Sequence, residues 1–243
     1  RQQGHLYASV GTAFKAPSPD QLYDQRAVPI PFPPFQTTFS NFTLKPQHGT
    51  NVEAGIYHSA ALIPNRLDAD ITVAAYQFDL KDELDFDVST LSYGNIGRSR
   101  HRGVELGVTV RSTALSGFAN YTMQAATART GDNSGNYLKA IPRHFVVAGV
   151  TAGRSTGVSG SLTATRAQDM VLDDANARKL PDWTRWDARV AYTLGAFRVS
   201  ADLLNLANAR FSTTGFPDPA GSDEVYYYPA AGRTLHVGLS WQR

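Results

Sequence analysis

The sequence predicts an all-β chain that forms a transmembrane, antiparallel, up-and-down β-barrel, with about ten of its strands present. Three observations support this fold class. About ten segments alternate between apolar and polar residues with a period of two, which is typical of strands with one apolar face. Their connections alternate between short turns and long loops. No apolar run approaches the roughly 18 residues of a membrane helix, so strands are the remaining way to cross a membrane.

Composition limits the alternatives. The chain has 243 residues, with 23 Lys and Arg against 21 Asp and Glu, a net charge of +2. This balance argues against a nucleic-acid partner. The chain has no cysteine, which excludes a disulfide framework and thiolate metal sites. Its first four residues show no signal-peptide pattern and lead directly into a strand, as expected for a piece of a longer chain.

The first half of the chain contains three predicted strands and a long loop. A strand is predicted over 4–13. The following segment, to about residue 46, is rich in proline and phenylalanine. It is predicted to be a loop because proline has no backbone N–H to donate to a β-ladder. Alternation returns over 50–60. The next strand starts at Leu67 and runs through Phe78 into an acidic end at 79–87. A polar loop is predicted over 89–101.

The second half is predicted to contain seven strands. The clearest covers 102–111, where Val104, Leu106, Val108 and Val110 share one face. Strands over 117–128, 157–166, 185–194 and 197–205 alternate similarly, whereas the facing of 142–152 is ambiguous because Phe145 to Val147 is continuously apolar. The last strand places Leu235, Val237, Leu239 and Trp241 on one face.

The polar faces of these strands carry charges that the apolar faces lack. Short turns separate the strands near residues 61–66, 113–116, 153–156 and 195–196, and long loops separate them elsewhere. Strands of about ten residues match the 9–11 needed to cross a bilayer. A soluble barrel or sandwich remains the alternative, but a lipid-facing outside and a watery inside fit better. The charged positions are Glu53, Asp70, Glu105, Arg111, Asp187, Arg189, Arg198 and Asp202.

Several short motifs, in this order and spacing, resemble the second half of the barrel of a TonB-dependent outer-membrane receptor. They cover almost the whole chain: 14–17 (FKAP), 44–46 (LKP), 53–55 (EAG), 95–97 (NIG), 102–106 (RGVEL), 205–211 (NLANARF) and 232–235 (GRTL). The resemblance implies that residues 1–243 are the C-terminal part of a 22-stranded barrel. One departure is the end of the chain, where the family usually has a terminal aromatic residue but Trp241 is third from last.

The resemblance also implies a function and partners. Such receptors sit in the bacterial outer membrane, surrounded by its lipid, and import ferric siderophores, cobalamin, haem or sugars. A ferric siderophore is the favoured cargo here. Energy would come from the TonB complex through an N-terminal plug domain that is absent from this chain. No resident cofactor or metal is expected. Haem is disfavoured because no histidine lies between Pro17 and Leu44, and His48 only follows.

The candidate ligand-binding residues lie in the predicted outer loops. Aromatic side chains and arginines could contact an anionic iron chelate there. Packing is an equally good interpretation for the phenylalanines, and salt bridging along the lumen wall to Glu105 or Asp187 is the better one for the arginines. The triple tyrosine 226–228 is better explained by loop packing or an interfacial girdle. The candidates are Phe32, Phe35, Phe39, Tyr93, Arg98 and Arg100.

A second interpretation is a complete ten-stranded barrel that acts as a protease or a passive channel. A histidine oriented by a carboxylate can activate water, and several acidic residues are predicted near the outer rim. Charged outer loops are more often merely solvated, so no catalytic residues are assigned. The residues of this alternative are Asp82, Asp85, Asp87, His101, Asp169, Asp173 and Asp174.

Overall fold

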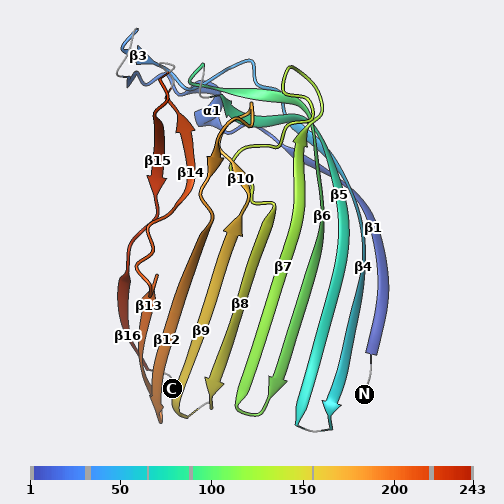
Figure 1. Cartoon of the computed structure of the whole chain (residues 1–243), viewed down its shortest axis with the longest axis vertical. Helices are drawn as coiled ribbons and strands as arrows, with labels where there is room; N and C mark the ends of the chain where they lie inside the picture. The colour runs from blue at the N-terminus through green and yellow to red at the C-terminus, as the bar shows by residue number, and fades with distance from the viewer. Residues whose placement is uncertain are drawn as a thin grey trace.

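Ten strands form one antiparallel sheet in which neighbours in sequence are neighbours in space. The computed structural model describes residues 3–30, 34–64, 66–87, 90–154, 156–218 and 222–241. The strand order is β1-β4-β5-β6-β7-β8-β9-β12-β13-β16, with no crossover between these ten strands. Figure 1 shows them side by side, with short turns at the lower end and long loops at the upper end. The predicted up-and-down topology is therefore confirmed.

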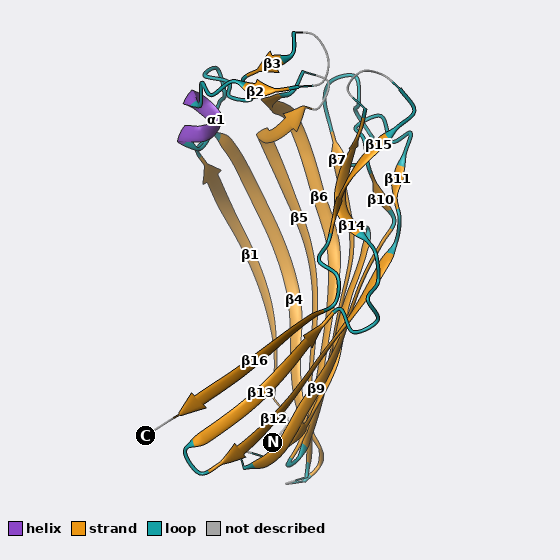
Figure 2. Ribbon diagram, turned by 90° about the vertical axis from the view of Figure 1, so that its left-hand side faces the viewer, coloured by secondary structure: helices purple, strands orange, loops and turns teal. Residues whose placement is uncertain are grey.

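Each of the ten strands overlaps one of the ten predicted segments. They are β1 (Gln3–Lys15), β4 (Gln47–Ile63), β5 (Leu67–Asp87), β6 (Ser92–Ser112), β7 (Leu115–Ala128), β8 (His144–Gly153), β9 (Gly157–Gln168), β12 (Trp183–Leu194), β13 (Phe197–Leu204) and β16 (Thr234–Trp241). β1 and β16 are the two edges of the sheet and do not pair with each other. Figure 2 shows that the sheet is curved and open, like part of a barrel wall.

The apolar side chains cover one face of the sheet, here called the outward face. Leu6, Ile56, Val73 and Leu106 stand in one row of partners across β1, β4, β5 and β6. Leu6 is 76% exposed and Val10 75% exposed, whereas Asn51, Glu53 and Tyr57 on the other face are half-buried. Side chains spread apart on the convex side of a curved sheet and crowd together on the concave side. The apolar face is therefore the convex one.

The concave face, here called the inward face, carries the predicted charges in polar contacts. The Tyr7 hydroxyl donates to Glu53 at 2.6 Å, and Arg111 pairs with Asp70. Further along the sheet, Arg189 Nε lies 3.3 Å from an oxygen of Asp202. Polar groups inside and apolar groups outside reverse the arrangement of a water-soluble protein, and match a barrel that faces lipid outside and water inside.

Two features of β5 and β6 differ from the prediction. The segment 89–101 was predicted to be a loop, but β6 starts at Ser92 and continues the β5 pairing to Asp87. The hairpin persists because cross-strand contacts hold its charged end, such as the ion pair between Arg100 and Asp79 at 2.6 Å. Asp82 has a left-handed φ of 56° and no partner in the register. Above it Glu83 contacts Ser99 and His101 on the inward face, so the two faces of β5 are exchanged there.

The long loops contain short elements that the sequence prediction treated as irregular. Helix α1 (Pro19–Tyr23) starts with a capping box between Ser18 and Gln21, with Pro19 in its first turn. The short strands are β2 (Val28–Pro29), β3 (Gln36–Thr37), β10 (Met170–Val171), β11 (Lys179–Leu180), β14 (Ser212–Pro217) and β15 (Val225–Pro229). No helix in the described residues is long and apolar enough to cross a membrane.

Several of the buried apolar residues in the described part of the chain lie in the long-loop segments. One cluster contains Ala167, Met170, Leu172 and Leu180, and partly buried Phe145 packs against it. In the β14–β15 hairpin, the ring centroids of Tyr226 and Tyr228 lie 5.5 and 5.8 Å from that of Phe216. The packing interpretation of the triple tyrosine therefore holds for these two residues.

The motif at 205–211 closes the loop after β13. Asn205 is 2% exposed, and its side chain binds the backbone of Ala209 and Ala231. Its own backbone N–H donates to Asp187 at 2.9 Å. Because Asn tolerates the left-handed φ of 51° that this turn needs, one residue supplies both the turn and its hydrogen bonds.

The inside-out arrangement predicts that a charge is tolerated on one face only. In the full-length receptor, Leu106→Arg places a cation on the outward face and should cost roughly 2–4 kcal/mol at the bilayer midplane. Thr163→Arg is the matched control, because Thr163 faces inward opposite Asp187. We expect Leu106→Arg alone to reduce the heat-modifiable, folded fraction on gels. Equal loss in both variants would contradict the assignment of the faces.

Candidate functional site

Three aromatic rings, one each from the 16–46 loop, β5 and β6, meet at the long-loop end of the sheet. The ring centroids of Phe39 and Phe86 are 5.3 Å apart, and those of Phe86 and Tyr93 are 5.2 Å apart. Both pairs meet edge to face. The Tyr93 backbone N–H donates to the carbonyl of Phe39 at 3.0 Å. Phe39 and Tyr93, both predicted as ligand contacts, are thus brought together. Phe86 was missed, although a lone phenylalanine among acidic residues was a signal for it.

Hydrogen bonds from two of the family-like motifs hold this loop in place. Asn95 accepts from the Lys45 backbone N–H at 2.9 Å and donates to the Lys45 carbonyl at 3.1 Å. Asn41 donates to the carbonyl of Tyr93 at 2.9 Å. The end of the 16–46 loop is therefore fixed to β6, which holds Phe39 next to Tyr93.

The remaining predicted phenylalanines have different surroundings. Phe35 is 59% exposed and occupies the turn between β2 and β3 with a φ of 63°. Phe32 lies outside the described residues. Phe35 therefore presents its ring to solvent at the long-loop end of the sheet, here called the mouth, apart from the aromatic cluster.

The structure corrects the lumen-wall interpretation of the arginines. The β5–β6 pairing is unbroken from Arg98 to Ser112. Arg98 and Arg100 lie even steps from Val104 and Leu106 within it, so they share the outward face. Glu105 is on the opposite face and cannot be their partner. Arg100 pairs with Asp79 instead. The alternation of residues 102–111, if extended to residue 98, would have placed both arginines on the apolar face. The prediction did not extend it because it treated the arginines as part of a loop.

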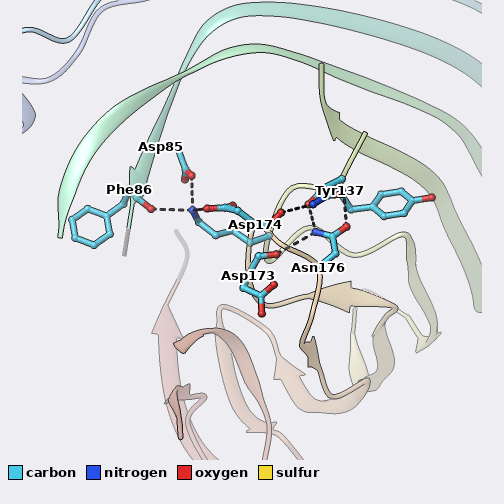
Figure 3. Close-up of polar contacts among 8 residues, drawn as sticks. Asp85, Phe86, Tyr137, Asp173, Asp174 and Asn176 are labelled. Carbon is cyan, nitrogen blue, oxygen red and sulfur yellow. Dashed lines mark hydrogen bonds and ion pairs between the residues drawn. The ribbon is translucent and has the colours of Figure 1, made fainter. Parts of the chain in front are cut away.

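Lys139 joins three segments at the mouth (Figure 3). Its ammonium contacts Asp85 at the end of β5 and Asp174 in the β9–β12 loop, the latter at 3.2 Å. It also donates to the Phe86 carbonyl at 2.9 Å. The lysine side chain is 19% exposed, so these charges are largely removed from water. This junction ties the β7–β8 and β9–β12 loops to the strand that carries the aromatic cluster.

A second contact beside Lys139 joins the same two loops. Asn176 accepts from the Tyr137 backbone N–H at 2.7 Å and donates to the Tyr137 carbonyl at 2.8 Å. Asp173 accepts from the backbone N–H groups of Ala177 and Arg178. These contacts fix the turn in which Asn176 has a left-handed φ of 58°.

Burial and pairing shift the pKa values of the junction. Burial raises the pKa of Asp85 above its usual value, even though Lys139 opposes this shift. Burial alone would lower the pKa of Lys139, but the carboxylates of Asp85 and Asp174 outweigh it and raise that pKa. The lysine therefore stays charged at neutral pH and serves as the fixed centre of the junction.

The residues of the alternative protease interpretation are engaged in other contacts. His101 lies 3.3 Å from Glu83, which also accepts from Ser99. Burial, which would raise the pKa of Glu83, is outweighed by these two partners, so that pKa is lowered. Asp169 pairs with Arg143 and Lys179. His101 thus has no ion pair with any predicted aspartate in the described residues, which also contain no metal-binding group of three His, Asp or Glu.

Sequence comparison identifies the family. The family model described as "TonB dependent receptor-like, beta-barrel" matches residues 2–206. The chain belongs to this family.

The relatives are receptors and transporters. The ferrichrome receptor FcuA of Yersinia enterocolitica is 30% identical over 164 residues, covering 63% of this chain and 21% of that protein. The ferric yersiniabactin uptake receptor FyuA of Yersinia pestis has a TM-score of 0.70 at 18% identity, and the match covers 98% of this chain and 35% of FyuA. The copper transporter OprC has a TM-score of 0.68 at 18% identity, covering 98% and 37%. The chain thus spans about a fifth to a third of these relatives.

The Lys139 junction should control the mobility of the mouth. Lys139→Met removes the charge from Asp85 and Asp174 and should cost about 1–2 kcal/mol, between the values for exposed and buried ion pairs. Amides of residues 129–143 and 169–182 should exchange roughly tenfold faster in the full-length receptor. Lys15→Met, which removes an exposed lysine at the end of β1, is the control. Unchanged exchange in Lys139→Met would show that the junction does not hold the loops.

Asp169 should make the β9–β12 loop sensitive to acid. The hydrogen bond from Lys179 lowers the pKa of Asp169, burial opposes it, and Arg143 lowers it further. A lowered pKa stabilises the loop fully above the ordinary value of 3.8, and this stabilisation is lost as the pH falls through the lower value. Asp169→Asn should therefore speed amide exchange at pH 6, and this effect should shrink as the pH falls below 3.8, after correction for intrinsic rates. An effect that does not change with pH would contradict this assignment.

Proposed function

We propose that the complete receptor containing this chain imports a ferric siderophore across the bacterial outer membrane. Membership of the TonB-dependent receptor family supports the transport role. We place the ligand-binding surface at the long-loop end because the aromatic cluster of Phe39, Phe86 and Tyr93 lies there. The ferrichrome and yersiniabactin receptors are the relatives that make an iron chelate the favoured cargo.

In this proposal the chain supplies part of the outer binding surface and of the barrel wall. Phe35, Phe39 and Tyr93 contact the organic part of the chelate through their ring faces and edges, with Phe86 as support. The polar inward face lines a water-filled path. The plug domain, outside this chain, moves to release the cargo, and the TonB complex supplies the energy. Lipid surrounds the outward face.

Uptake of labelled siderophores tests this proposal. Cells that depend on the full-length receptor are given ferric hydroxamate, catecholate and citrate complexes. The double variant Phe39→Ala/Tyr93→Ala should lower uptake of the transported complex at least tenfold with unchanged surface abundance, because the ligand loses its aromatic contacts. Tyr192→Ala, on the outward face near a short turn, should leave uptake unchanged.

Two results would contradict the proposal. If the wild-type receptor transports none of the three iron complexes, the cargo class is wrong. If the double variant transports the cargo normally at normal abundance, the aromatic cluster is not part of the binding surface. Surface abundance is measured by labelling intact cells in the same cultures.

A further inference from the structure

The ladder between β5 and β6 is interrupted at Asp82 and Gly97. The register places Lys81 opposite Arg98 and Glu83 opposite Ile96, and the two residues between them are not paired. Asp82 has a φ of 56°, in the left-handed region. Apart from glycine, Asp and Asn are among the residues that adopt this conformation most readily, and β-branched residues rarely do. This rung is therefore the one irregular point in the described β5–β6 pairing.

Both strands exchange their faces at this rung. By alternation alone, Glu83 would share the outward face of Lys81, two residues before it. It lies 3.3 Å from His101 on the inward face instead. Ile96, the partner of Glu83, packs against the inward cluster that contains Ala126, which itself pairs with His101. The end of the hairpin, here called the hairpin tip (83–87 and 92–96), is thus turned over relative to the strands below it.

The exchange decides which side chains of the hairpin tip face the two neighbouring loops. Asp85 is directed at the ammonium of Lys139 in the β7–β8 loop (Figure 3). Phe86, the next residue, meets Phe39 of the 16–46 loop. Without the exchange, alternation would direct Phe86 toward Lys139 and Asp85 toward Phe39. Carboxylates would then take the place of the aromatic ring on the side of the 16–46 loop.

The side chain of Asn95 holds the exchanged conformation. Its amide group donates to the carbonyl of Asp82 at 2.8 Å. The same side chain accepts from the backbone N–H of Lys45 at 2.9 Å and donates to the Lys45 carbonyl at 3.1 Å. One amide group therefore joins the left-handed residue to the end of the loop that carries Phe39.

The β6 side of the rung has no room for a side chain. A Cβ atom at Gly97 would lie 2.5 Å from the hydroxyl oxygen of Thr130. That hydroxyl accepts from the backbone N–H of Arg98 at 2.8 Å, so it cannot move away without losing this bond. The close approach of the β7–β8 loop therefore requires glycine at this position, and the exchange is fixed from both strands.

We propose that Asp82 is a positioning residue for the cargo, because its left-handed conformation turns the aromatic side of the hairpin tip toward the binding surface. This inference rests on the proposed function, in which Phe39 and Tyr93 contact the chelate. Asp82 acts through Phe86 and Tyr93 and does not itself touch the cargo. In the opposite arrangement, the carboxylates of the tip would face the cargo and repel an anionic chelate.

Substitutions at Asp82 that differ in their tolerance of a positive φ test the proposal in the full-length receptor. The probe is whichever of the ferric hydroxamate, catecholate and citrate complexes the wild type transports. Asp82→Val should raise its half-saturating concentration roughly tenfold with an unchanged maximal rate, because binding loses an aromatic contact while the later steps are intact. Asp82→Gly should stay within about twofold of wild type, because glycine adopts a positive φ readily.

The matched control is the same substitution at an aspartate without a left-handed φ. Asp132 is exposed in the β7–β8 loop and is not among the described residues with a positive φ. Asp132→Val should therefore leave the half-saturating concentration within about twofold of wild type, because no face exchange depends on its backbone.

Cross-linking reports the exchange without any cargo. The chain has no cysteine, so Phe39→Cys/Phe86→Cys adds the only thiol pair within it. A short bifunctional thiol reagent should join the pair in the wild-type background and with Asp82→Gly. With Asp82→Val the yield should fall roughly fivefold, because residue 86 then points to the opposite face. Asn95→Ala, which removes the bond to the Asp82 carbonyl, should change the yield and the half-saturating concentration in the same direction.

Each outcome decides for or against the positioning role. Heat-modified gel mobility selects the folded variants, and Asn95→Ala replaces Asp82→Val if the latter is not folded. Loss of both cross-link and affinity in Asp82→Val, with both retained in Asp82→Gly and Asp132→Val, supports the proposal. A retained cross-link in Asp82→Val, equal losses in Asp82→Gly, or a lost cross-link with unchanged affinity overturns it. Failure of the proposed function is a separate result, in which the wild type transports none of the three complexes while the cross-link still reports the faces.

Discussion

The antiparallel hydrogen-bond ladder is the constraint on which the rest of this structure depends. In hydrocarbon every backbone N–H and C=O needs a protein partner, and ten neighbouring strands supply these partners between themselves. Once the backbone is satisfied laterally, side chains project only outward or inward. The outward set can then be apolar and exposed, as Leu6 and Val237 are, while Glu53 and Asp202 remain inside with polar partners.

The long-loop end is organised by polar contacts rather than by a large apolar core. Lys139 connects β5 to two loops, and Asn95 fixes the return of the 16–46 loop. The apolar clusters in this region are small, such as the one around Leu172. Directional contacts of this kind hold the loops in defined positions at the mouth, so Phe39 and Tyr93 can present a shaped aromatic surface instead of a mobile one.

The two faces of β6 illustrate how one strand serves two environments. Its even positions pass from valine and leucine to three arginines, and its odd positions carry Glu105 and His101 toward the interior. Arg98, Arg100 and Arg102 therefore belong to the outward face of the barrel wall, and Glu105 and His101 belong to its inward face.

The sequence by itself determined the ten strands, their order, the short and long connections and most of the outward face, because each of these depends on local alternation and turn residues. It also determined the family, through motifs such as that around Asn205. Only the tertiary structure decided the length of β5 and β6, the pairing of Arg100 with Asp79, and the meeting of Phe39, Phe86 and Tyr93. These features depend on contacts between segments far apart in the chain, and the face exchange at Asp82 depends on a left-handed φ that no alternation pattern reveals.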